Sequence, residues 1–322
     1  MRQLKLTEIY APVGKELHEV EKIIAESLKD TEGDVLEMSN HILSSKGKML
    51  RPACVLLCAK LDGEEVKEEA LHFAAAVELL HMASLVHDDI MDMAETRHNI
   101  QTINAKWNDN AAMIYGDFLI ASAVEQLSYC RQSIVRSISR YMKQVCQGQT
   151  TQVINRDNLE LSENAYQEII ERKTAVLFEA AGELGAKIAR GKNFSSLKEF
   201  AYNFGIAYQL IDDYLDFGSS ERMGKKLGEN LKLGELTLPV ILLLKKASEA
   251  DRKELLDIIR SKDEAAVGRI SEKIEEYGIK KEIMERIDFY TRKARENLDS
   301  LPDSPSKDAM IRVLELSMSR IR

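Results

Sequence analysis

Two acidic motifs with the same internal spacing stand out among the residues of this chain that could do chemistry. Each has the form Asp-Asp-x-x-Asp: the first triplet is Asp88, Asp89 and Asp92, and the second triplet is Asp212, Asp213 and Asp216. On a helix, residues four apart share a face, so the two outer carboxylates of each triplet would lie about one turn apart. Like charges at that spacing repel each other, and a cation between them would relieve the repulsion.

Apolar residues flank both triplets, whereas an ordinary run of carboxylates lies on a solvated face. The flanking residues are Leu85, Val86, Ile90 and Met91 for the first triplet, and Leu210, Ile211, Leu215 and Phe217 for the second. Burying an unpaired carboxylate costs several kcal/mol, which a cation can offset. Chance is a poor explanation, because only about 0.07 such triplets are expected in a chain of this aspartate content.

Carboxylate oxygens without His or Cys nearby are typical of Mg²⁺ or Mn²⁺ sites. Mg²⁺ usually binds through one or two carboxylates together with oxygens of a substrate phosphate. We therefore expect the outer carboxylates of both triplets to clamp a diphosphate through metal ions. The predicted metal ligands are Asp88, Asp92, Asp212 and Asp216.

Helices are predicted to position these residues, because apolar residues recur at intervals of three and four along most of the chain. Strand-like alternation is absent, and only 5 prolines and 16 glycines interrupt the pattern. Breaks are expected at residues 46–47, 61–63, 116, 190–192, 218–220 and 301–303. No low-complexity linker divides the chain, so we expect one all-α domain over residues 1–322. Its motif-bearing core is about residues 40–245, and a charged helical layer follows over residues 246–322.

Composition and charge exclude several classes of function. The net charge is −8 and the pI is about 5.5, so no positive field exists to gather nucleic acid. The N-terminus lacks the apolar region of a secretory signal, and no stretch reaches the roughly eighteen apolar residues of a spanning helix. Cys54 and Cys58 lie one turn apart in an apolar run and are interpreted as buried thiols. These features predict a cytoplasmic protein without an integral membrane segment.

A basic segment, residues 46–52 (KGKMLRP), precedes the first triplet. Together with the two triplets, in this order within roughly residues 40–245, it resembles the motifs of the trans-isoprenyl (polyprenyl) diphosphate synthases of the long-chain type. The resemblance implies an isoprenoid synthase bundle of roughly ten or more helices, with both triplets facing a large central cavity. It also implies a cluster of about three Mg²⁺ ions, with Mn²⁺ as the other candidate, and a homodimer.

The resemblance also assigns substrate-binding residues. For isopentenyl diphosphate they are Lys48, Arg51 and His81, with His98 as a further candidate. For the allylic diphosphate they are Arg97, Lys173, Thr174, Gln209 and Lys225. A histidine in an apolar helix is by itself more often a core residue, and the matching neighbours of His81 favour the binding role. The predicted catalytic residues are the six aspartates of the triplets and Lys173.

Three positions depart from the pattern of that family. His98 replaces an arginine, Asn230 replaces an aspartate, and Glu235 stands where many members have lysine. A neutral histidine offers one donor where arginine offers a permanent charged fork. We therefore expect weaker or more pH-dependent phosphate binding, above all of isopentenyl diphosphate.

These residues predict a prenyltransferase that condenses isopentenyl diphosphate with an allylic diphosphate through a metal-stabilised allylic cation. Product length is predicted from the stripe that precedes Asp88 by successive helical turns, which contains Leu80 and Ser84, with Ala83 close beside it. Members that make short chains resemble one another in placing bulky aromatic residues there, whereas Ala83 and Ser84 are small. A product of about thirty to forty carbons is therefore expected from the open stripe.

Three alternatives stay open. The first is a short-chain synthase with products of about fifteen to twenty carbons. The second is a class I terpene cyclase, which typically pairs one aspartate triplet with an Asn/Ser/Glu metal motif, whereas this chain has a second aspartate triplet. The third is the regulatory subunit of a two-part synthase, which the departures at His98 and Glu235 keep open.

Overall fold

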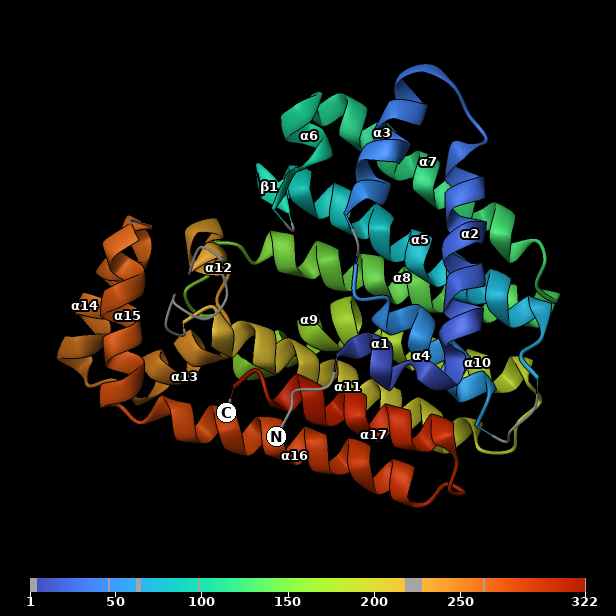
Figure 1. Cartoon of the computed structure of the whole chain (residues 1–322). Helices are drawn as coiled ribbons and strands as arrows, with labels where there is room; N and C mark the ends of the chain where they lie inside the picture. Colours follow the sequence, from blue (N-terminus) through green and yellow to red (C-terminus); the bar gives the residue numbers. More distant parts are fainter. Residues whose placement is uncertain are drawn as a thin grey trace. The chain divides into compact units, whose positions relative to one another are not determined.

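The structure is a computed structural model that describes residues 5–45, 47–61, 65–97, 99–217, 228–262 and 264–321. Almost all of these residues are helical, which confirms the predicted all-α class (Figure 1). The first elements are α1 (Leu6–Ile9), the 3-10 turn η1 (Ala11–Val13), α2 (Gly14–Lys29), α3 (Gly33–Ser44), α4 (Leu50–Ala59), α5 (Glu68–Met91), β1 (Thr96–Arg97), β2 (Ile100–Gln101), α6 (Ile103–Lys106) and α7 (Asp109–Leu127). The remaining elements are α8 (Gln132–Ile154), α9 (Glu163–Ile170), the π-helical turn η2 (Glu171–Ala175), α10 (Val176–Ile188), α11 (Phe194–Leu215), α12 (Glu229–Leu233), α13 (Leu238–Lys246), α14 (Glu249–Ser261), α15 (Glu264–Glu276), α16 (Ile279–Asp299) and α17 (Pro305–Met318).

The chain forms two compact units. The first comprises residues 1–139, 180–198 and 300–313, and the second comprises residues 140–179, 199–299 and 314–322. In the first unit, α5 packs against α2, α4 and α7. Its buried face is rich in alanine, which lets neighbouring helices come close and places the first triplet at the end of a well-packed helix.

The break predicted at Gly116 is wrong, because this residue lies inside α7. A Cβ atom at this position would lie 2.1 Å from Nε2 of His87 on α5. The glycine therefore serves the close approach of α5 and α7 within the first unit, and not a turn.

In the second unit, α13 is the most deeply buried helix, since every side chain of residues 238–244 is buried. It packs against α9, α15 and α16. Helices α14, α15 and α16 bury an apolar face in the same core, as Ile279, Ile283 and Ile287 do at successive turns of α16. Their charged residues lie on the opposite faces.

Among the described residues, α5 is the one helix that is long and apolar enough to cross a membrane, with a mean hydropathy of 1.3 over its best window. The prediction that no stretch reaches this length is therefore corrected. That window is 61% buried inside the protein, and a core helix of a globular protein meets the same criterion.

Candidate functional site

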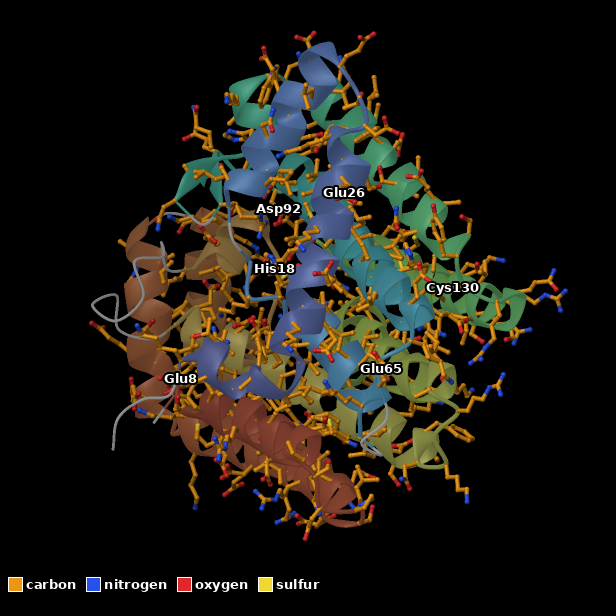
Figure 2. All side chains as sticks on the ribbon, turned by 45° about the vertical axis from the view of Figure 1, so that its right-hand side comes forward. Glu8, His18, Glu26, Glu65, Asp92 and Cys130 are labelled. Atoms are coloured by element: carbon orange, nitrogen blue, oxygen red, sulfur yellow. The ribbon has the colours of Figure 1, made fainter. Side chains whose placement is uncertain are left out.

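The first triplet lies at the C-terminal end of α5, and its three carboxylates differ in exposure. Asp89, the middle residue, is 5% exposed, whereas Asp88 and Asp92 are half-buried. Asp92, labelled in Figure 2, is the C-cap residue of α5. The burial expected from the apolar flanks therefore holds for the middle carboxylate, while the outer pair stays accessible.

Arg97 neutralises the buried Asp89. Its Nε and Nη2 atoms donate to Oδ1 of Asp89 at 2.8 and 2.7 Å. Burial raises the pKa of Asp89 above its ordinary value, and the hydrogen bond from Arg97 opposes that shift. The resemblance predicts that Arg97 holds the allylic diphosphate, and in this structure its guanidinium binds Asp89 of the first triplet.

A small hairpin presents Arg97, where the sequence pattern indicated no strand. Strands β1 and β2 pair antiparallel, with Arg97 opposite Ile100, and Asn99 takes the left-handed backbone conformation at φ 65°. The hairpin is fixed from outside by the ring of His41, whose Nε2 donates to the carbonyl oxygen of Gln101 at 2.8 Å. His98 lies outside the described residues.

The second triplet, at the end of α11 and just beyond it, repeats the pattern of the first. Asp213 is 4% exposed, and Asp212 and Asp216 are half-buried. Tyr166 Oη donates to Oδ2 of Asp213 at 2.5 Å, and Gln209 Nε2 donates to Oδ1 at 2.8 Å. Burial raises the pKa of Asp213 to about 7, and these two hydrogen bonds oppose the shift.

Two predicted allylic ligands join this network. Thr174 Oγ1 donates to Oε1 of Gln209 at 2.8 Å, so Thr174, Gln209 and Asp213 form one row. Lys173 precedes Thr174 in the π-helical turn η2, a kind of turn that is frequent at functional sites. Lys225 lies outside the described residues.

Asp216 is saturated with hydrogen bonds from the chain. Its Oδ1 accepts from the backbone N–H groups of Gly228 and Glu229, and its Oδ2 accepts from the backbone N–H and Nδ2 of Asn230. These four bonds occupy the roughly four acceptor sites of a carboxylate. Asn230 contributes a side-chain donor that the aspartate of the family pattern would lack when ionised.

Asp212 has a cationic partner near the C-terminus. Arg320 Nη2 lies 2.6 Å from Oδ1 of Asp212, and the guanidinium stands over the ring of Tyr208, 5.4 Å from its centroid. Arg320 Nη1 is buried without a hydrogen-bond partner. The second triplet thus carries an internal counter-ion that sequence reasoning missed, because nothing in the sequence near Arg320 links it to residue 212.

The basic loop that precedes α4 belongs to the first unit. Met49, the N-cap of α4, takes the left-handed conformation at φ 50°, which is uncommon for a side chain of its kind. Tyr10 Oη donates to the carbonyl oxygen of Lys48 at 3.2 Å. Lys48 is exposed, and Arg51 is half-buried in the first turn of α4.

Glu78 is a buried carboxylate close to this loop that sequence reasoning also missed. It is 7% exposed, and its Oε1 would lie 3.6 Å from a Cβ atom built on Gly47. Burial raises its pKa to about 7, and the positive charge of Arg51 opposes the shift. His81, three residues further along α5, is half-buried.

The predicted chain-length residues also lie on α5. Leu80 and Ala83 are buried, at 6% and 2% exposure, whereas Ser84 is half-buried and its Oγ donates to the carbonyl oxygen of His81 at 2.7 Å. Ser84 is therefore the member of this set whose side chain retains access to space outside the packed core.

The donor chemistry of the outer carboxylates fits a divalent cation. Asp88 and Asp92 are half-buried oxygen donors one turn apart, and Asp212 already binds a cation in the form of Arg320. Asp216 would have to release a hydrogen bond to take part. Over the described ranges no three His, Cys, Asp or Glu side chains converge to hold an ion. Mg²⁺ needs no such cage, since it binds through one or two carboxylates plus phosphate and water oxygens.

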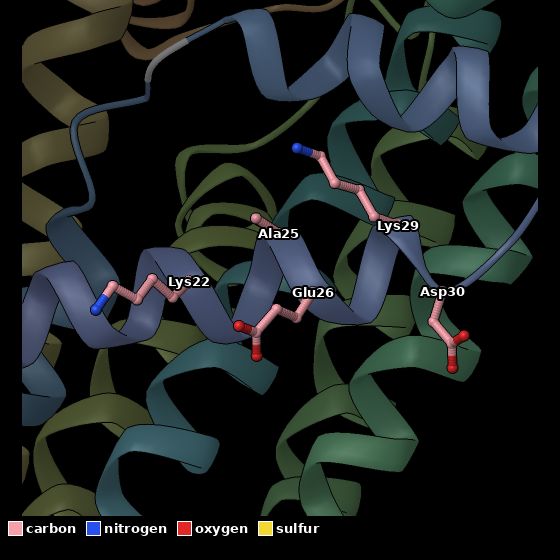
Figure 3. Close-up of a pocket in the computed structure, with 5 residues that line it drawn as sticks. All are labelled: Lys22, Ala25, Glu26, Lys29 and Asp30. Carbon is pink, nitrogen blue, oxygen red and sulfur yellow. The ribbon is translucent and has the colours of Figure 1, made fainter.

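A surface depression in the first unit, of about 440 Å³, contains none of these residues (Figure 3). It runs along α2 and is lined by Lys22, Ala25, Glu26, Lys29 and Asp30. Four of these five lining residues are charged and all come from one stretch of chain, so the depression lacks the apolar enclosure of a small-molecule site. It is therefore not a candidate substrate-binding site.

Comparison with known proteins gives one consistent result. The model of the polyprenyl synthetase family matches residues 33–277. The all-trans-nonaprenyl-diphosphate synthase (geranyl-diphosphate specific) of Rhodobacter capsulatus is 32% identical over 319 residues, covering 98% of this chain and 98% of that protein. The short chain isoprenyl diphosphate synthase of Methanothermobacter thermautotrophicus is 32% identical over 307 residues, covering 92% of this chain and 94% of that protein.

Among solved structures, a decaprenyl diphosphate synthase from Rhodobacter capsulatus superimposes with a TM-score of 0.92. It is 26% identical, and the match covers 99% of this chain and 100% of that one. The family match spans both triplets and every predicted substrate-binding residue. This chain therefore belongs to the polyprenyl synthetase family.

Proposed function

We propose that this chain is a trans-polyprenyl diphosphate synthase that condenses isopentenyl diphosphate with an allylic diphosphate. The observation that carries the proposal is the shared design of the two triplets. In each, a buried middle aspartate is held by protein donors, and the outer pair remains half-buried. The middle residues then act as supports, and the outer residues as ligands of divalent cations, with Mg²⁺ as the first candidate and Mn²⁺ as the second.

The proposed reaction begins with the allylic diphosphate held by Lys173, Thr174 and Gln209, and by Arg97 if it leaves Asp89. Bound divalent cations would supply neutralisation of the diphosphate and of the departing pyrophosphate. The allylic C–O bond breaks, and the double bond of isopentenyl diphosphate attacks the resulting cation. A proton is then lost to the released pyrophosphate. Lys48, in the loop before α4, and Arg51, in the first turn of α4, would orient isopentenyl diphosphate, with His81 and His98 as further contacts.

The direct test is mass spectrometry of the products that the purified chain forms with Mg²⁺, isopentenyl diphosphate and each allylic primer in turn. A series of longer prenyl diphosphates supports the proposal. Hydrocarbon release from farnesyl diphosphate alone would identify a terpene cyclase instead. No turnover by the chain alone, with turnover restored by a second protein, would identify a subunit of a two-part synthase.

Product length is proposed to be long, about thirty to forty carbons, because Ser84 and Ala83 are small. Relatives of equal identity include a nonaprenyl and a short-chain enzyme, so overall similarity does not decide this property. Ser84→Phe is expected to shorten the main product by at least one isoprene unit, as read by mass spectrometry. Ala83→Tyr should act in the same direction with a lower melting temperature, because overpacking a buried site costs about 1–3 kcal/mol.

The control for product length is Ser133→Phe, which adds the same bulk at an exposed position of α8. An unchanged product distribution in Ser84→Phe, with normal turnover, would exclude this stripe as the path of the growing chain.

Arg320 is expected to compete with divalent cations for Asp212. Arg320→Gln removes the internal counter-ion, so binding of Mn²⁺ in the presence of inorganic pyrophosphate should tighten by roughly threefold to tenfold, the range for a partly buried ion pair. Electron paramagnetic resonance of free Mn²⁺ measures this without turnover. Arg295→Gln, which breaks an exposed pair with Asp299, is the matched control. Equal or weaker Mn²⁺ binding in Arg320→Gln would show that Asp212 is not a cation ligand.

A homodimer located in the cytoplasm is proposed as the working form. An exposed apolar stripe on α7 supports the dimer, since Met113, Ile120 and Val124 are 52%, 38% and 59% exposed. These residues lie seven and four positions apart and so share one face of the helix. Apolar residues grouped on one exposed face are typical of protein interfaces.

A further inference from the structure

Lys173 begins a row of four hydrogen-bonded side chains within the second unit. Its Nζ donates to Oε1 of Gln152 at 2.7 Å, and Nε2 of Gln152 donates to Oε2 of Glu235 at 2.5 Å. Oε1 of Glu235 accepts from Nε and Nη2 of Arg156, both at 2.8 Å. Glu235 is 8% exposed, so the far end of the row is a buried, charge-assisted pair.

The amide of Gln152 has only one orientation that satisfies both neighbours. The ammonium group of Lys173 can only donate, and the ionised carboxylate of Glu235 can only accept. The oxygen of the amide must therefore face Lys173, and its nitrogen must face Glu235. A side chain that is normally free to flip is fixed by the charges at its two ends.

The backbone brings the same helix face against Lys173. A Cβ atom on Gly148 would lie 2.6 Å from the backbone nitrogen of Lys173, so α8 touches the π-helical turn at this point. Gln152 follows Gly148 by one turn, and Arg156 follows Gln152 by another. Gly148 thus lets α8 come close to the π-helical turn η2. Gln152 and Arg156, which follow on the same face, provide the side chains of the row.

The buried pair makes a firm anchor for this row. Removing either partner of a buried ion pair leaves an unpaired charge, which is strongly unfavourable. Glu235 and Arg156 therefore hold each other in place. The negative residue at position 235, which suggested weak phosphate binding from sequence, is neutralised by Arg156.

We propose that Gln152, held by Glu235 and Arg156, is a positioning residue that fixes the ammonium group of Lys173 for the diphosphate of the allylic substrate. The proposal rests on the proposed function, in which Lys173 binds that diphosphate. A lysine side chain has high rotamer freedom, which binding would otherwise have to restrict. Prior fixation by Gln152 removes that cost before the substrate arrives.

Gln152→Leu tests the row by removing both hydrogen bonds at similar size. The KM for the allylic diphosphate should rise about tenfold, because Lys173 is no longer held in advance. At saturation the bound diphosphate itself orients Lys173, so kcat should stay within about twofold. Gln147→Leu, at an exposed position of the same helix, is the matched control and should leave both parameters unchanged.

Exchanging the amide of residue 152 and the carboxylate of residue 235 distinguishes a positioning role of Gln152 from a general structural role. Gln152→Glu alone places two carboxylates against each other and should impair the enzyme as much as Gln152→Leu. Adding Glu235→Gln rebuilds the row, since Lys173 and the new amide both donate to residue 152 while Arg156 donates to the amide oxygen. The double variant should therefore recover most of the KM of the wild type.

An unchanged KM in Gln152→Leu, or a double variant as impaired as the sum of its two single changes, would overturn the proposal. Calorimetric binding of inorganic pyrophosphate with Mg²⁺ provides a second readout that needs no turnover, and it should weaken in Gln152→Leu. A wild-type chain that neither binds pyrophosphate nor extends any primer would instead reject the proposed function. The two failures are therefore distinguishable.

Discussion

Replacing Asp88 or Asp212 by alanine is expected to lower turnover by roughly 10³-fold while the fold survives. Both side chains are half-buried outer members of their triplets, so their removal leaves no cavity in a packed core. Each would remove one oxygen ligand of the divalent cations that are proposed to carry the diphosphate. Steady-state rates at saturating substrates and at the Mg²⁺ concentration that saturates the wild type measure the effect, and circular dichroism checks the fold.

The matched control is Asp257→Ala, which removes an aspartate that is exposed on α14 and pairs with Arg260. It should keep wild-type rates. Higher Mg²⁺ concentrations should partly restore Asp88→Ala, because a lost ligand weakens cation binding without abolishing it. Wild-type turnover in either triplet variant would refute the metal assignment.

Glu78→Gln is expected to change the pH dependence of stability by on the order of 3 kcal/mol between pH 5 and pH 8. Burial raises the pKa of Glu78 from 4.5 to about 7 in the folded state, with Arg51 opposing the shift. Between these two values the folded chain binds a proton that the unfolded chain has lost. The wild type therefore loses stability as pH rises through this window, whereas a permanently neutral glutamine has no such loss.

Urea denaturation of the wild type and of Glu78→Gln at pH 5 and pH 8 measures this difference. At pH 8 the free energy of unfolding of Glu78→Gln should rise relative to that of the wild type. Glu254→Gln, at an exposed position of α14, should follow the wild type at both values. Parallel stability curves for wild type and Glu78→Gln would mean that Glu78 titrates near its ordinary pKa.

The sequence was sufficient to predict the helical class. The apolar spacing that predicts helices is local, and so is the spacing that places two carboxylates on one face. The difference in burial between the middle and outer aspartates of each triplet was not predictable. It depends on partners far along the chain, such as Tyr166 for Asp213.

Other features were hidden for the same reason. Glycine is typical of a helix break, so the sequence predicts one at Gly116. The ring of His87 on α5 lies where a side chain of residue 116 would be, which explains a glycine inside α7. Arg320, just beyond the end of α17, is one of many charged residues in the C-terminal part of the chain, and its contact with Asp212 joins residues more than a hundred positions apart. The negative charge of Glu235 predicts weaker phosphate binding from the sequence, but Arg156, 79 positions earlier in the chain, neutralises it.

The saturation of Asp216 joins two processes that would otherwise be independent. Its oxygens accept hydrogen bonds from the backbone N–H groups of Gly228, Glu229 and Asn230, which lie at the start of the short helix α12. An ion that bound an oxygen of Asp216 would displace at least one of these hydrogen bonds and would therefore weaken the first turn of α12. By thermodynamic reciprocity, strengthening that turn would then weaken the binding of the ion to Asp216 by the same factor.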